Sequence, residues 1–81
     1  MRYVLFAKES CPFCVKAEHL LQKQEKEYKL VNFEKDQESV LQEIKEAYKW
    51  PTVPMIFKVG DDKLITFVGG YTDLIEHFEG E

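Results

Sequence analysis

Four short runs of hydrophobic residues along the chain predict four β-strands. Residues 3–7, YVLFA, are apolar almost throughout, as expected of a strand that is buried on both faces of a sheet. A second run covers residues 28–33, and two further runs cover residues 55–59 and 63–68. The last two are separated only by residues 60–62, GDD, which predicts a tight hairpin between two antiparallel strands.

The intervals between these runs carry the spacing of α-helices. Apolar positions recur every three or four residues over 12–26, and a proline in the first turn suits a helix start because its missing N–H needs no partner there. A second helix is expected to follow an N-cap at Asp36 and to end before Pro51. A third is expected to start from a cap at Thr72 and to end at Gly80.

The apolar residues of the first two predicted helices mark the faces that should pack on the sheet. Each helix is therefore expected to cover the sheet with one side only. On the first helix these residues are Cys14, Ala17, Leu20 and Leu21. On the second helix they are Val40, Leu41, Ile44 and either Ala47 or Tyr48.

The predicted elements follow one another in the order β-α-β-α-β-β-α. The first β-α-β unit should form a right-handed parallel crossover, and the hairpin should then add antiparallel strands. We therefore predict the α/β class, with a mixed four-stranded sheet flanked by helices. Residues 1–81 contain no repeat, linker or low-complexity segment, which predicts a single domain with a modest stability margin.

The composition narrows the functional classes. The chain has 81 residues, of which 44% are hydrophobic, and a formal net charge of −4 with acidic and basic residues mixed along the sequence. This mixture predicts no nucleic-acid-binding surface and no polybasic membrane patch. No apolar run approaches the roughly 20 residues needed to cross a bilayer, and the first residues are charged too early for a signal peptide. We expect a soluble monomer in the cytoplasm.

The two cysteines of the chain, Cys11 and Cys14, form a Cys-x-x-Cys pair between the first predicted strand and helix. In a reducing compartment such a pair indicates redox chemistry or metal binding rather than a structural disulfide. At the helix start, Cys11 would lie near unpaired N–H groups and the positive end of the helix dipole, which both favour the nucleophilic thiolate. Cys14, one turn later, should be more buried and could resolve a mixed disulfide formed at Cys11.

A metal site is the weaker interpretation of this pair. A closed zinc site needs four protein ligands, and the remaining candidates are His19 and His77. His19 follows Cys14 by five residues on the same predicted helix and should point to a different face, while His77 belongs to the last helix. We therefore expect no metal site within one chain, and a cluster that bridges two chains remains an alternative.

Three motifs together resemble the dithiol glutaredoxins, a family with the thioredoxin-like fold. They are KESCPFC at residues 8–14, TVP at 52–54 and GGYTDL at 69–74, in this order and with the predicted elements between them. The resemblance covers essentially the whole chain. It implies that Cys11 is the nucleophile, that Cys14 is the resolving thiol, and that the proline of the TVP motif follows a cis peptide bond.

The same resemblance implies a groove for the tripeptide glutathione as a co-substrate, with no bound cofactor. Thr52 and Val53 would pair with the middle of the tripeptide, the start of the last helix would meet its γ-glutamyl end, and Lys8 would face its glycine carboxylate. Phe13 and Tyr71 would wall the groove. The full set implied to bind glutathione is Lys8, Phe13, Thr52, Val53, Pro54, Gly70, Tyr71, Thr72 and Asp73.

The resulting hypothesis is a glutathione-dependent oxidoreductase that reduces protein disulfides and glutathione mixed disulfides through Cys11 and Cys14. Its partners would be glutathione and disulfide-containing or glutathionylated proteins, of which ribonucleotide reductase is one example. Two alternatives stay open. One is a thioredoxin-like electron donor, for instance to ribonucleotide reductase, that is recharged by a flavoprotein reductase. The other is a module that binds a metal or an iron–sulfur cluster.

Overall fold

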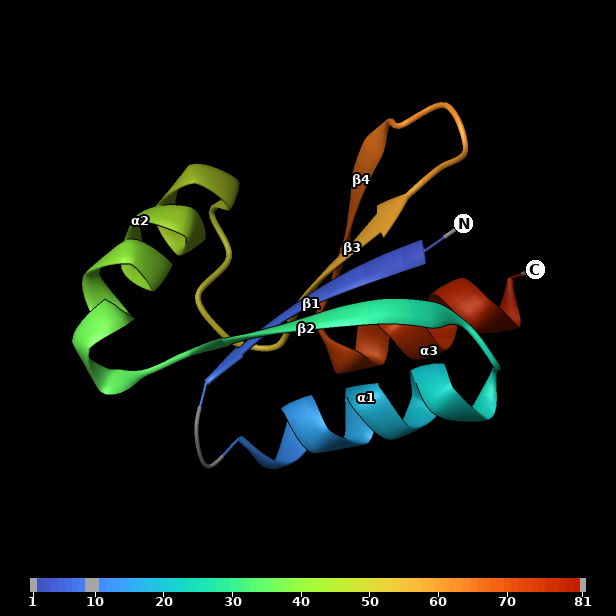
Figure 1. Ribbon diagram of the computed structural model, residues 1–81, viewed down its shortest axis with the longest axis horizontal. Coiled ribbons are helices and arrows are strands. Elements are labelled where there is room, and N and C mark those ends of the chain that lie inside the picture. The colour runs from blue at the N-terminus through green and yellow to red at the C-terminus, as the bar shows by residue number, and fades with distance from the viewer. Residues whose placement is uncertain (1, 9–10, 81) are drawn as a thin grey trace.

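The computed structural model describes residues 2–8 and 11–80, and its strands form one sheet between layers of helices (Figure 1). Helices α1 and α3 lie together on one side of the sheet, and α2 lies on the other side. The predicted order of strands and helices is confirmed. The elements are β1 (Arg2–Lys8), α1 (Pro12–Lys23), β2 (Glu27–Phe33), a 3₁₀ turn (Lys35–Gln37), α2 (Glu38–Tyr48), β3 (Met55–Val59), β4 (Ile65–Gly69) and α3 (Tyr71–Glu79).

The sheet has the strand order β2-β1-β3-β4, so β1 and β3 are its inner strands. β1 and β2 pair in parallel, and α1 supplies the crossover that a parallel pair requires. β3 pairs antiparallel with both β1 and β4. The predicted mixed four-stranded sheet and the thioredoxin-like fold are therefore confirmed. Because β1 ends at Lys8, an inner strand brings the chain to the cysteine pair.

The side of the sheet that faces α1 and α3 carries the main hydrophobic core. Alternate residues of β1 point toward this side, and Tyr3 and Leu5 have no exposed surface. The face predicted for α1 is confirmed, because its Cys14 is buried and its Leu20 packs partly buried against the core. The fully buried cluster comprises Tyr3, Leu5, Ala17, Leu21, Ile56 and Leu74.

The side of the sheet that faces α2 is less completely covered. Val4 and Phe6 of β1 are only half-buried there, so the predicted burial of this strand on both faces is complete on one face only. Of the stripe predicted for α2, Leu41 is buried, but Val40 and Tyr48 are 50% and 48% exposed. Successive helix residues point about 100° apart, so Val40 turns outward once Leu41 faces the sheet. The predicted stripe is therefore wrong at Val40.

Two helix caps differ from the sequence prediction. Asp36 lies inside the 3₁₀ turn before α2, and Gln37 takes the N-cap position of that helix. The last helix is capped at Gly70 rather than at Thr72, and the Asp73 carboxylate accepts a hydrogen bond from the Gly70 N–H at 2.9 Å. Several polar side chains near each helix start are suitable acceptors, and the direction in which the chain enters the helix selects among them.

The connection between β3 and β4 is longer than predicted. It covers residues 60–64 and is closed by two backbone hydrogen bonds of 2.9 Å, from the Gly60 N–H to the Leu64 carbonyl and from the Lys63 N–H to the Gly60 carbonyl. Lys63 has a left-handed conformation with φ 67°, which belongs to a turn rather than a strand. β4 therefore begins at Ile65 instead of at Lys63.

Gly69 ends β4 in a conformation that glycine adopts much more readily than other residues, with φ 123°. A Cβ atom at this position would lie within 2.8 Å of three atoms of the Asp73 side chain. Asp73 is held in place by its hydrogen bond to the Gly70 N–H, so it has little freedom to move away. Both the backbone and the space at position 69 therefore require glycine.

We expect Gly69→Ala to lower the free energy of unfolding by about 1–3 kcal/mol, the usual cost of one strained backbone position. Chemical denaturation of the purified variant measures this change. Gly80→Ala is the matched control, because Gly80 has an ordinary right-handed conformation with φ −81° and should accept a methyl group with little change. Equal losses in the two variants would contradict the special requirement at Gly69.

Candidate active site

The Cys-x-x-Cys pair lies where β1 leads into α1. Cys11 is the N-cap residue of α1, with φ −108° and ψ 100°, and its Sγ accepts a hydrogen bond from the Cys14 N–H at 3.2 Å. Pro12 begins the helix without an N–H, and the first turn carries no acidic side chain. The sulfur of Cys11 thus takes the place that an oxygen usually occupies at a helix cap, beside the positive end of the dipole. Its predicted position at the helix start is confirmed.

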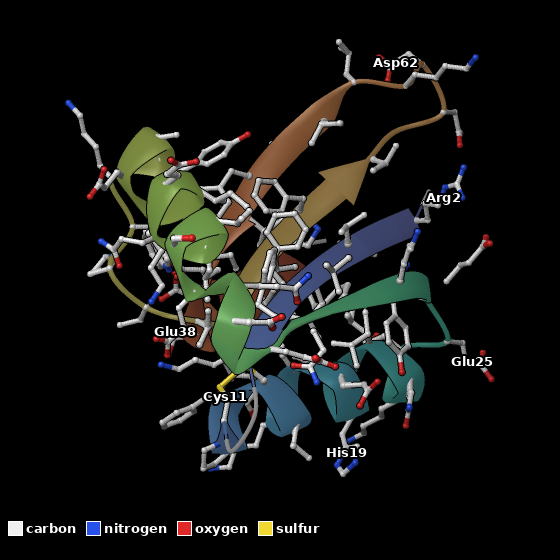
Figure 2. The ribbon with its side chains drawn as sticks, turned by 60° about the vertical axis from the view of Figure 1, so that its left-hand side comes forward. Arg2, Cys11, His19, Glu25, Glu38 and Asp62 are labelled. Atoms are coloured by element: carbon white, nitrogen blue, oxygen red, sulfur yellow. A yellow bond between two sulfur atoms is a disulfide. The ribbon has the colours of Figure 1, made fainter. Side chains whose placement is uncertain are left out.

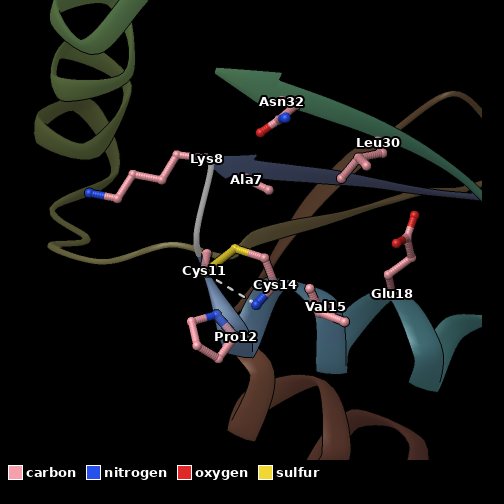
Figure 3. Close-up of a pocket in the computed structure, with 9 residues that line it drawn as sticks. All are labelled: Ala7, Lys8, Cys11, Pro12, Cys14, Val15, Glu18, Leu30 and Asn32. Carbon is pink, nitrogen blue, oxygen red and sulfur yellow. Dashed lines mark hydrogen bonds between the residues drawn. A yellow bond between two sulfur atoms is a disulfide. The ribbon is translucent and has the colours of Figure 1, made fainter. Parts of the chain in front are cut away.

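Cys11 and Cys14 are joined by a disulfide, with their Cα atoms 5.2 Å apart (Figure 2, Figure 3). Cys14 is only 5% exposed, whereas Cys11 is partly exposed, so the predicted difference in burial is confirmed. A molecule that approaches from solvent therefore reaches the Cys11 sulfur first.

The TVP segment lies next to the Cys11 sulfur. The peptide bond between Val53 and Pro54 is cis, as the family resemblance implied. The carbonyl oxygen of Val53 is 3.9 Å from Cys11 Sγ. Pro54 immediately precedes β3, so the second inner strand brings this segment to the cysteine pair just as β1 brings Cys11.

A groove of about 310 Å³ extends from the TVP segment to the start of α3. It brings together eight of the nine residues implied for glutathione binding and adds Trp50. Residues 50–54 and 70–73, which are far apart in the sequence, thus form one surface near Cys11. The lining residues are Phe13, Trp50, Thr52, Val53, Pro54, Gly70, Tyr71, Thr72 and Asp73.

Lys8 is the ninth residue of that set, and it does not line this groove. It borders a cleft of about 530 Å³ together with both cysteines, and a smaller cleft beside α2 together with Lys45 and Glu38. Its side chain extends from the end of β1 toward α2 (Figure 3). The charge of Lys8 is thus near the disulfide but outside the groove, and its contact with a glycine carboxylate stays a prediction.

Two aromatic rings that line the groove pack against each other. The ring centroids of Phe13 and Tyr71 are 6.1 Å apart, and Phe13 is 54% exposed. The ammonium group of Lys16 lies 5.0 Å from the centroid of the Phe13 ring, which adds a positive charge to the outer rim. The groove is thus walled by rings that a ligand can contact directly.

Trp50 is the lining residue that the sequence analysis did not identify. Its ring packs edge-to-face against Phe67 of β4, with the ring centroids 5.3 Å apart. The only signal in the sequence is its position two residues before the TVP motif. That position alone does not predict which way the side chain turns.

The cleft that contains both cysteines also holds a fixed carboxylate, Glu18, which lies on α1 (Figure 3). Its Oε2 accepts a hydrogen bond of 2.9 Å from the Tyr28 hydroxyl, and Gln22 donates to the same hydroxyl at 2.8 Å. Burial, with a further contribution from the Glu18 carboxylate, raises the pKa of Tyr28. The phenol therefore stays protonated at neutral pH and keeps donating to Glu18.

The two histidines lie apart from the cysteine pair. His19 is exposed on α1, and His77 Nε2 lies 3.0 Å from the hydroxyl of the buried Tyr3. Among residues 2–8 and 11–80, no cluster of three or more His, Cys, Asp or Glu side chains could hold a metal ion. In the same part of the chain no helix is long and apolar enough to span a membrane.

A thioredoxin-like sheet with a Cys-x-x-Cys disulfide at the start of α1 defines a thiol–disulfide oxidoreductase. The family model named Glutaredoxin matches residues 3–65, so the chain belongs to the glutaredoxin family. No curated protein sequence matches the chain significantly.

Solved glutaredoxin structures share this fold. A wheat glutaredoxin is 29% identical, with a TM-score of 0.81 over 96% of this chain and 69% of its own. A dithiolic glutaredoxin from Trypanosoma brucei brucei is 34% identical, with a TM-score of 0.79 over 98% of this chain and 78% of its own. A buckwheat glutaredoxin–glutathione complex, at 23% identity, has a TM-score of 0.80 over 96% of this chain and 69% of its own.

The difference in burial predicts unequal reactivity of the two thiols. After reduction and brief treatment with limiting iodoacetamide, we expect alkylation at Cys11 before Cys14, because Cys14 is almost inaccessible and Cys11 faces solvent beside the helix start. Peptide mapping by mass spectrometry measures the ratio. The protein unfolded in denaturant is the control and should show nearly equal labelling. Preferential labelling of Cys14 in the folded protein would contradict this assignment of the outer and inner thiols.

Proposed function

We propose that this glutaredoxin is a glutathione-dependent oxidoreductase that reduces glutathione mixed disulfides and protein disulfides. One observation carries the proposal: the more exposed sulfur, that of Cys11, lies 3.9 Å from the Val53 carbonyl oxygen, and Val53 lines the groove. A short peptide that lies along the groove can therefore bring its own sulfur to Cys11.

The chemistry of the groove suits glutathione. The backbone of Val53 can pair with the cysteine residue of the tripeptide. The N–H groups in the first turn of α3 suit the carboxylate of the γ-glutamyl residue. Asp73 accepts from Gly70 through one carboxylate oxygen, and its other oxygen can meet the γ-glutamyl amino group. The buckwheat protein was crystallised with glutathione, so the fold itself is compatible with this ligand.

Reduction of a glutathione mixed disulfide needs only Cys11. Its thiolate attacks the glutathione sulfur, a Cys11–glutathione disulfide forms, and the target leaves as a thiolate that takes up a proton. The thiolate of a second glutathione then attacks the glutathione sulfur bound to Cys11. This step releases oxidised glutathione and regenerates the Cys11 thiolate.

Reduction of a protein disulfide uses both cysteines. Cys11 attacks one sulfur of the target and forms a mixed disulfide, releasing the first target thiol. Cys14 then attacks Cys11 Sγ, which releases the second target thiol and forms the Cys11–Cys14 disulfide. Two glutathione molecules reduce this disulfide and leave as oxidised glutathione. The two electrons that reduce the target thus come from two glutathione thiols.

The decisive test is steady-state reduction of a glutathionylated peptide by the wild type, Cys11→Ser and Cys14→Ser, with glutathione and glutathione reductase as the recycling system. We expect no turnover for Cys11→Ser, because no nucleophile remains at the groove. Cys14→Ser should keep turning over this substrate but should lose reduction of a protein disulfide through the dithiol route. Circular dichroism of the three proteins controls for folding.

A parallel assay replaces glutathione and its reductase with thioredoxin reductase. Turnover in the glutathione system alone is the expected result. Turnover only with thioredoxin reductase would replace the proposal by a thioredoxin-like electron donor with the same fold and thiols. Turnover retained by Cys11→Ser would overturn the assignment of the nucleophile.

A further inference from the structure

Trp50 has a buried polar group that the proposed mechanism does not use. Its Nε1–H is shielded from solvent and finds no hydrogen-bond acceptor among the residues that the structure describes. A buried indole N–H usually has a partner, and leaving it without one is costly. No other side-chain nitrogen or oxygen in the described residues is buried in this unpaired way. The ring nevertheless lines the groove next to the Cys11 sulfur.

The neighbours of Trp50 locate this edge of the ring. A methyl group built on Gly70 would lie 3.5 Å from Cζ2 of Trp50 and 3.8 Å from Oδ2 of Asp73. Cζ2 and Nε1 are bonded to the same ring carbon, so the N–H edge of the indole borders Gly70. Gly70 and Asp73 form the end of the groove at which the proposed function seats the γ-glutamyl residue.

One aromatic neighbour supports the ring in the free protein. It packs edge-to-face against Phe67, with the ring centroids 5.3 Å apart and an interplanar angle of 82°. The absence of a side chain on Gly70 leaves room beside its N–H edge. Because no hydrogen bond of Nε1 to a described residue has to be broken, the indole can turn toward the groove at little cost in polar contacts.

We infer that Trp50 is a ligand-contacting residue that recognises the γ-glutamyl end of the substrate. Ligand entry turns the ring, and Nε1–H donates a hydrogen bond to the α-carboxylate of the γ-glutamyl residue. This inference rests on the proposed function, since it names the part of glutathione that the groove selects. A ligand that lacks this carboxylate leaves the indole N–H unpaired, as it is in the free protein. Such a ligand gains no hydrogen bond from Trp50, so it binds less tightly than glutathione.

Kinetics of Trp50→Phe test the inference. Phenylalanine keeps one aromatic ring against Phe67 and removes the N–H donor together with the second ring of the indole. The comparison of two ligands below separates the loss of the donor from the loss of volume. With a glutathionylated peptide we expect KM to rise about 10- to 100-fold at nearly unchanged kcat, the size of one hydrogen bond to a charged group. With the same peptide carrying cysteinylglycine instead of glutathione, which lacks the γ-glutamyl residue, the two proteins should have the same KM.

Tyr48→Phe is the matched control for this variant. Tyr48 packs against Phe67 on the same aromatic cluster, with centroids 5.2 Å apart, but it does not line the groove. Loss of its hydroxyl should leave KM unchanged for both peptides. An equal rise of KM for both peptides in Trp50→Phe would assign Trp50 a purely structural role and overturn the inference.

A second measurement uses the native tryptophan, the only one in the chain. In ¹⁵N-labelled Cys14→Ser protein, trapped as a Cys11 mixed disulfide, the single indole N–H resonance reports its own hydrogen bond. We expect the indole proton to lie further downfield, and to exchange more slowly with solvent, in the glutathione adduct than in the cysteinylglycine adduct. Identical indole spectra for the two adducts would overturn the inference. Absence of glutathione-dependent turnover in the wild-type protein would instead overturn the proposed function. Failure of the inference on Trp50 and failure of the proposed function are therefore distinguishable.

Discussion

A sulfur atom caps the first helix of this protein, and the site depends on that contact. The N–H of Cys14 donates to Cys11 Sγ, so the bond that caps the start of the helix also supplies positive potential at the Cys11 sulfur. Two features of the sequence favour this contact. Pro12 begins the helix without an N–H, and no acidic side chain lies in the first turn. The contact that starts the helix thus also places an N–H donor at the Cys11 sulfur.

The two inner strands determine where the rest of the site lies. β1 ends just before the cysteine pair, and β3 begins just after the cis bond at Val53 and Pro54. These strands pair with each other at the centre of the sheet, where burial restricts movement. The groove is therefore attached to the buried centre of the sheet, while Phe13, which lines it, remains exposed.

The sequence predicts strands and helices with a strong hydrophobic pattern well. It predicts features that depend on the three-dimensional path of the chain poorly. The apolar run of β1 and the helical spacing of α1 leave few alternatives, and both elements are found, although α1 ends at Lys23 rather than near residue 26. The caps at Asp36 and Thr72 were wrong because several nearby residues are suitable acceptors and only the path of the chain selects one. The cis bond at Pro54 followed from the family resemblance, since no local pattern favours cis over trans.

The lining of the groove was likewise predicted where a sequence motif identifies the residue, and missed where only tertiary contacts do. The family motifs identified eight of its lining residues, but Trp50 was missed, because its place depends on contacts with Phe67 and Gly70, which are distant in the sequence. The family resemblance placed Lys8, the first residue of the cysteine motif, at the groove, yet the end of β1 directs its side chain toward α2. Sequence distance to a motif is therefore a poor guide to side-chain direction.

The close approach of position 69 to Asp73 has a consequence for how this sequence can evolve. The carboxylate that closes the start of α3 occupies the space that any side chain at position 69 would need. The two positions are therefore coupled, and substitutions at them should not be independent. If Gly69 is replaced first, the new side chain has an unfavourable backbone conformation and clashes with Asp73. A lineage that first shortens Asp73 to alanine removes the carboxylate but keeps the Cβ atom, which would still lie 2.8 Å from a Cβ at position 69. Position 69 therefore stays closed to larger residues in either order of the two changes.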